Sequence, residues 1–189
     1  MSEINTVTKI IFLLEKICQA YRNYLWQIAY KEDLTPTQIE ILQTVVSCPQ
    51  SNVSHIAKEL GVSKPTASEA IKALIEKGFL HAQNDPSDKR KKILTLTKKG
   101  RALTKRTEKL NALFLNCLEK LPPSQNKNLY KALLLTVKIL YEEGMFKLIR
   151  FCPFCANRKS SPQPICIITN KPVSPENFRP NCPHFKEIN

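Results

Sequence analysis

Two short predicted helices separated by only three residues constrain this fold more than any other feature. The first covers about residues 54–60, and Gly61 follows at a position that favours the left-handed conformation ending a helix. Ser63 is a suitable N-cap for the second helix, which runs to about Lys77 and ends at Gly78. Two helices joined by so short a turn are typical of a helix-turn-helix.

A basic hairpin is predicted directly after this helix pair. Residues 79–82 and 92–96 have the composition of two short β-strands. The segment between them contains NDPSDKRK (residues 84–91), which combines turn-forming and basic residues. A basic β-hairpin immediately after a helix-turn-helix predicts a wing.

The stretch over residues 53–100, VSHIAKELGVSKPTASEAIKALIEKGFLHAQNDPSDKRKKILTLTKKG, resembles the MarR family of multiple-antibiotic-resistance-type regulators. The similar features are the helix-turn-helix, the D-P-x-D-x-R run from Asp85 and the L-T-x-x-G run from Leu96. The similarity extends in order and character over roughly residues 6–148. It implies a homodimer that binds a pseudo-palindromic DNA site, in many relatives under control of a small ligand bound beside the dimer helices.

The first turn of the second short helix carries the candidate DNA-reading residues. In a helix-turn-helix these residues meet base edges in the major groove. Small hydroxyls and a lysine can bond to bases and phosphates, and Thr66 and Ala67 are expected to pack on thymine methyls. Ile71, Leu74 and Ile75 are expected to face the core. The predicted DNA-binding residues are Ser63, Lys64, Pro65, Thr66 and Ser68.

The predicted wing contributes a second set of DNA contacts. Arg90 is the candidate for insertion into the minor groove, and the resemblance implies that Asp88 orients it. The resemblance also implies that Lys89, Lys91 and Lys92 contact phosphates, which makes binding salt-dependent. The whole chain has 29 Lys and Arg against 16 Asp and Glu, a net charge of +13 that favours a polyanionic partner, with double-stranded DNA ahead of a membrane.

Long helices with apolar faces are predicted on both sides of this unit. Helical spacing of apolar residues covers about 7–30, 98–120 and 124–148. We interpret the three helices as a dimerisation scaffold for two copies of the chain. A separate helix begins at Thr35, where Pro36 and Gln38 complete a capping box. The predicted fold is mainly α, with domains over 1–33, 34–97, 98–149 and 150–189.

The last forty residues form a different kind of segment, rich in cysteine and proline. In a cytosolic protein such a cluster binds metal more often than it forms disulfides. We predict a four-cysteine site that stabilises this module or senses a signal, with zinc preferred over an iron–sulfur cluster. Disulfide switching and free thiols stay open as alternatives. The predicted ligands are Cys152, Cys155, Cys166 and Cys182, whereas Cys18, Cys48 and Cys117 are predicted to be buried structural thiols.

The sequence gives little support to a membrane protein, a secreted protein or an enzyme. There is no uncharged apolar run of the ~20 residues that span a bilayer and no cationic leader, so a cytoplasmic location is expected. No paired carboxylates, Ser/His/Asp set or phosphate-binding glycine loop suggests an enzyme. The predicted function is therefore a sequence-specific transcriptional regulator, a repressor in preference to an activator, with a small-molecule or redox effector as a further partner. The alternative is an interaction adaptor in which the cysteine module docks a partner protein.

Overall fold

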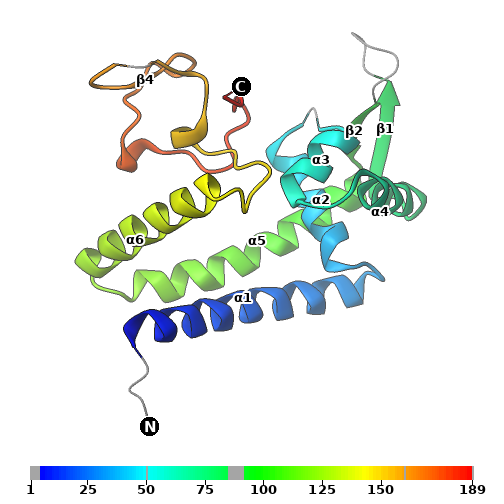
Figure 1. Ribbon diagram of the computed structural model, residues 1–189. Helices are drawn as coiled ribbons and strands as arrows, with labels where there is room; N and C mark the ends of the chain where they lie inside the picture. Colours follow the sequence, from blue (N-terminus) through cyan, green and yellow to red (C-terminus); the bar gives the residue numbers. More distant parts are fainter. Residues whose placement is uncertain (1–4, 50, 85–91, 160, 189) are drawn as a thin grey trace.

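The computed structural model describes residues 5–49, 51–84, 92–159 and 161–188. Six α-helices and a β-hairpin lie within these ranges, so the prediction of a mainly helical winged helix is confirmed. The long helices α1 (Thr6–Lys31), α5 (Lys98–Glu119) and α6 (Pro123–Glu142) lie side by side (Figure 1). A lobe of shorter elements sits at one end of this layer, and the C-terminal segment packs above α6 (Figure 1).

Helix α2 (Pro36–Ser47) begins at the predicted capping box. The Thr35 hydroxyl oxygen accepts the backbone N–H of Gln38 at 3.3 Å, and the Gln38 side-chain oxygen accepts the backbone N–H of Thr35 at 3.0 Å. Leu34 and Ile39, on either side of this cap, are both buried in the core. The cap therefore fixes the turn between α1 and α2.

The helix-turn-helix and the wing hairpin have the predicted order. Helix α3 (Val53–Leu60) ends at Gly61, whose φ of 68° is left-handed, and α4 (Lys64–Glu76) begins three residues later. Strands β1 (Leu80–Asn84) and β2 (Lys92–Leu96) pair antiparallel. The first strand starts one residue later than predicted, because the Phe79 N–H donates to the Leu74 carbonyl of α4 at 2.8 Å, and it ends two residues later.

A close contact fixes the base of the wing. The Thr97 hydroxyl caps α5 by accepting the Gly100 N–H at 3.0 Å, and it donates to the Gly78 carbonyl at 2.7 Å. A Cβ atom at Gly100 would overlap the carbonyl oxygen of Phe79. The glycine of the L-T-x-x-G run is therefore required by packing.

The core lies between the second half of α1, the short helices, the hairpin and the start of α5. Ile71 and Leu74 of α4 face it as predicted, but the prediction for Ile75 is wrong, because its side chain is 37% exposed. Helix α6 ends at Glu142 and not near 148, because Gly144 adopts a φ of 73° just beyond it.

The layer of long helices leaves many apolar side chains uncovered. Cys18 on α1 and Cys117 on α5 are exposed and Cys48 is half-buried, so the prediction of three buried thiols is wrong. None of the described helices is long and apolar enough to cross a bilayer. The exposed apolar residues include Val7, Ile10, Ile11, Phe12, Leu13 and Ile17 of α1, Leu113, Leu115 and Leu118 of α5, and Leu129, Leu133, Leu135, Ile139 and Leu140 of α6.

Candidate nucleic-acid interface and cysteine module

The first turn of α4 presents a row of polar side chains to solvent. The Ser63 hydroxyl oxygen accepts the Thr66 N–H at 3.2 Å, and the two hydroxyl oxygens are 2.7 Å apart. Ala67 is 0% exposed on the core side, so the expected contact with a thymine methyl is wrong. The other predicted base- and phosphate-contacting residues, Ser63, Lys64, Pro65, Thr66 and Ser68, are all exposed.

The opposite end of α4 is anchored. The Lys77 ammonium donates to the Asp33 carboxylate at 2.9 Å, and this hydrogen bond holds the pKa of Asp33 below its ordinary value. The Lys99 ammonium donates to the Lys77 carbonyl at 3.0 Å and lies 4.1 Å from the centre of the Phe79 ring. The helix is therefore fixed at its C-terminal end while its N-terminal turn faces solvent.

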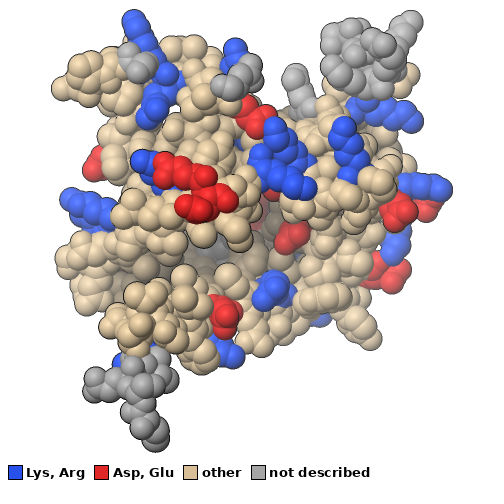
Figure 2. Space-filling model, viewed as in Figure 1, with Lys and Arg blue, Asp and Glu red and all other residues tan. Residues whose placement is uncertain are grey.

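The wing hairpin rises beside α4 (Figure 1). Lys and Arg side chains gather next to its base on the face shown in Figure 2. The predicted wing residues Asp88, Lys89, Arg90 and Lys91 lie outside the described residues, so their contacts stay predictions.

Comparison with known proteins identifies this lobe. The MarR family model matches residues 34–92, which cover α2 to the start of β2. An uncharacterised HTH-type transcriptional regulator of Staphylococcus aureus is 36% identical over 86 residues, and this chain spans 59% of the length of that relative. The DNA-binding lobe of this chain is therefore similar to the MarR family of transcriptional regulators. A match to transcriptional regulators agrees with the prediction that the chain is not an enzyme.

Solved structures of similar proteins share the architecture. The Staphylococcus aureus MarR in complex with salicylate and kanamycin superposes with a TM-score of 0.63 at 24% identity, covering 72% of this chain and 93% of that one. The transcriptional repressor CouR, bound to a 23-mer DNA duplex, superposes with a TM-score of 0.55 at 28% identity, covering 72% and 99%. The MarR likeness therefore includes the long helices as well as the DNA-binding lobe.

The four tail cysteines surround one cavity, although they come from separate parts of the cysteine module (residues 150–188). The cavity has a volume of about 320 Å³ and all four side chains line it. The backbone N–H of Arg179 donates to Cys152 Sγ at 3.2 Å, and that of Lys186 donates to Cys155 Sγ at 3.4 Å. Among the described residues, no three His, Cys, Asp or Glu side chains lie close enough to hold one metal ion.

Short elements position these thiols. Cys152 lies in the 3-10 turn η1 (Cys152–Phe154), and Cys166 ends strand β4 (Ile165–Cys166), which pairs with β3 (Arg158–Lys159). Burial raises the pKa of the Cys152 thiol, whereas a hydrogen bond from the Thr169 side chain lowers the pKa of Cys166. The thiols of Cys152 and Cys166 therefore differ in how readily they ionise.

The cysteine module contacts the layer of long helices through aromatic residues. The rings of Tyr141 on α6 and Phe154 in the module are 4.3 Å apart. The Tyr130 hydroxyl, also on α6, donates to the carbonyl of Pro175 at 2.9 Å.

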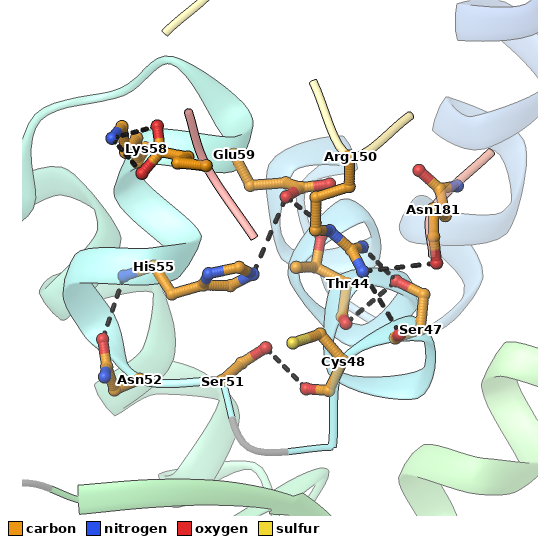
Figure 3. Close-up of polar contacts among 11 residues, drawn as sticks. Thr44, Ser47, Cys48, Ser51, Asn52, His55, Lys58, Glu59, Arg150 and Asn181 are labelled. Atoms are coloured by element: carbon orange, nitrogen blue, oxygen red, sulfur yellow. Dashed lines mark hydrogen bonds and ion pairs between the residues drawn. The ribbon is translucent and has the colours of Figure 1, made fainter. Parts of the chain in front are cut away.

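The same module contacts the DNA-binding lobe through one arginine. Arg150 has a side chain only 3% exposed, and its Nε donates to Glu59 of α3 at 2.7 Å. Its Nη2 donates to the Ser47 hydroxyl of α2 at 2.7 Å (Figure 3). The backbone N–H of Cys182 in turn donates to the Arg150 carbonyl at 3.3 Å. One residue thus links a cysteine of the cavity to the first helix of the helix-turn-helix.

Sequence reasoning missed this arginine contact. A charged residue inside the apolar run Leu148–Ile149–Arg150–Phe151 was the available signal, because an arginine buried in such a run needs a partner. The partner itself is 91 positions away and no local pattern identifies it.

His55 borders the same contact. Its Nε2 lies 3.7 Å from a carboxylate oxygen of Glu59 and has no hydrogen-bond partner among the described residues. Burial lowers the pKa of His55.

A shallow cleft of about 670 Å³ lies between α1, α2 and α4. Arg22 and Trp26 of α1 and Thr66 and Glu69 of α4 are among its lining residues. Trp26 is 57% exposed there.

Proposed function

We propose that this chain is a sequence-specific DNA-binding transcriptional regulator, acting in the cytoplasm as a repressor. The exposed first turn of α4 beside the wing carries the proposal, because a helix-turn-helix places these positions against base edges. The likeness to CouR, whose structure contains a DNA duplex, supports it.

The active form in this proposal is a homodimer. The apolar faces of α1, α5 and α6 would be covered by the same helices of a second copy. Large areas around these helices carry few charged side chains on the face drawn in Figure 2. A dimer would place two α4 helices on successive major grooves, about 34 Å apart.

Substitutions in the first turn of α4 test the DNA-binding role. Thr66→Ala should cost about 1–3 kcal/mol in discrimination between preferred and scrambled sites, because a base contact is lost. Lys64→Ala should weaken binding to all sequences and lower the salt slope by about one, because a phosphate contact is lost. Binding is measured by fluorescence anisotropy on duplexes selected from a random pool.

Lys138→Ala is the matched control, because it removes the same charge from α6, which lies away from α4 (Figure 1). Its affinity should equal that of the unmodified chain. Equal affinity of all three variants would contradict the proposed role of α4.

We further propose that the four cysteines of the module bind a metal centre. A segment with so little regular structure has no large apolar core of its own, and metal coordination can organise such a segment. Replacing all four cysteines by serine separates this role from the adaptor alternative. Loss of a partner protein with DNA affinity and metal content unchanged would favour the adaptor.

The cleft between α1, α2 and α4 is the proposed site for a small-molecule effector. Thr66 lines the cleft and also lies in the DNA-reading turn, so a ligand there would alter DNA binding. Trp26 is the only tryptophan of the chain, and its fluorescence therefore reports directly on the cleft. Titration with salicylate, compared with Trp26→Phe, should quench fluorescence and weaken DNA binding over the same concentration range.

A further inference from the structure

The four cysteines of the module line one cavity but are not gathered around a single point. Zinc bound by four thiolates lies about 2.3 Å from each sulfur, which brings the sulfurs to roughly 3.8 Å from one another. The four cysteines here are spread around a volume of about 320 Å³. Among the described residues no three of these side chains lie close enough to hold a single ion, and a cluster of several iron and sulfide ions bridges thiolates that stand further apart.

The walls of the cavity also suit an anionic sulfur-rich group. Backbone N–H groups already donate to Cys152 Sγ and Cys155 Sγ, and hydrogen bonds to sulfur are a main determinant of iron–sulfur cluster properties. Arg158, Lys171 and Arg179 line the same cavity against one carboxylate, that of Glu176, and this excess of positive charge would partly balance four thiolates and their cluster.

The order of the ligands agrees with this assignment. The pair Cys152 and Cys155 is separated by two residues, and Cys182 is followed directly by Pro183. Both features occur in cysteine runs that hold iron–sulfur clusters.

We propose that Cys152, Cys155, Cys166 and Cys182 hold an iron–sulfur cluster in this cavity. The inference rests on the proposed metal-binding role of the module and names the cofactor, reversing the preference for zinc drawn from the sequence. The cluster replaces the four thiol protons and joins η1, β4 and the C-terminal loop through Fe–S bonds.

The test uses the full chain, purified without oxygen, with the metal removed and then restored. One sample receives zinc, and another receives sulfide with equal amounts of ferrous and ferric iron, so that no further oxidant or reductant is needed. We expect iron and acid-labile sulfide in equal amounts, several irons per chain, and broad visible absorbance. Zinc added to the loaded protein should not displace the iron.

Serine variants locate the site. Replacing any one of the four cysteines by serine should reduce the iron content several-fold. The double variant Cys18→Ser/Cys117→Ser, which changes exposed cysteines on α1 and α5, should retain it. If one serine variant fails to fold, the proposal is still tested by the metal content of the unmodified chain after reconstitution.

The opposite results overturn the proposal. The proposal is wrong if the chain binds one zinc and no sulfide, or if it binds no metal at all. It is also wrong if iron is lost when Cys18 and Cys117 are replaced. DNA affinity is measured on the same samples. A chain that binds DNA but no cluster contradicts only this inference, and a cluster-loaded chain that binds no DNA contradicts only the regulator.

Discussion

At the scale of single residues, Gly100 lies where α5 passes closest to the end of α4. Gly100→Ala places a methyl group against the Phe79 carbonyl, and backbone cannot yield as a flexible side chain can. We expect a loss of about 1–3 kcal/mol in the free energy of unfolding, as for other overpacked sites. Urea denaturation measures it, with Ala102→Ser as an exposed control on the same helix. An unchanged urea midpoint would contradict this prediction, because it would mean that α5 shifts enough to accommodate the methyl group.

His55 predicts a dependence of stability on pH. Burial is the main reason that its pKa is lowered; Glu59 and Glu187 oppose the shift, whereas Arg150 and Lys58 add to it. The unfolded chain therefore takes up a proton below about pH 6.5 while the folded chain resists it, so stability falls as pH drops through this range.

Thermal denaturation between pH 7.5 and 5.5 measures this effect. The His55→Gln variant should lose less stability over the same interval than the unmodified chain. Parallel curves for the two proteins would assign the pH dependence to other groups.

At the scale of elements, the contact between the cysteine module and α3 depends on the buried Arg150–Glu59 pair. Arg150→Met leaves a carboxylate without its partner, and breaking a buried pair costs about 3–5 kcal/mol. We expect earlier proteolytic cleavage near residue 150 and a lower midpoint of unfolding. The double variant Arg150→Met/Glu59→Gln should recover part of the loss, because no unpaired charge remains.

Lys58 and Glu187 provide the matched control for that pair. They join the same two segments, but both side chains are more than 40% exposed. Exposed pairs contribute less than about 1 kcal/mol, so Lys58→Gln should change stability little. A cost for Lys58→Gln as large as that for Arg150→Met would contradict the central role of Arg150.

At the scale of the whole molecule, the uncovered faces of α1, α5 and α6 predict self-association. Ile11→Glu introduces a charge into the apolar face of α1 and should shift the chain to monomers in sedimentation equilibrium. DNA affinity should fall with it, because two linked recognition helices bind more tightly than one. Asn23→Glu, an exposed polar position on α1, should leave the dimer intact. A monomeric unmodified chain would contradict the dimer.

The sequence predicted the elements better than the contacts between them. Capping residues such as Thr35 and Ser63 act within one turn, so local patterns placed the starts of α2 and α4 correctly. Ala67 and Ile75 were misassigned because helical spacing alone does not define the edge of a buried face. The Arg150–Glu59 pair depends on tertiary packing between distant segments. Convergence of the four cysteines on one cavity was expected from the motif, but its volume was not.

If the exposed apolar layer joins two chains, the amount of DNA-binding regulator depends steeply on how much of the chain the cell makes. At low abundance the number of dimers rises with the square of the number of chains, so halving synthesis removes about three quarters of the DNA-binding species. Occupancy of an operator would then switch over a narrower range of expression than a monomeric protein allows. The long helices α1, α5 and α6 would thus make gene control sensitive to the expression level of the regulator.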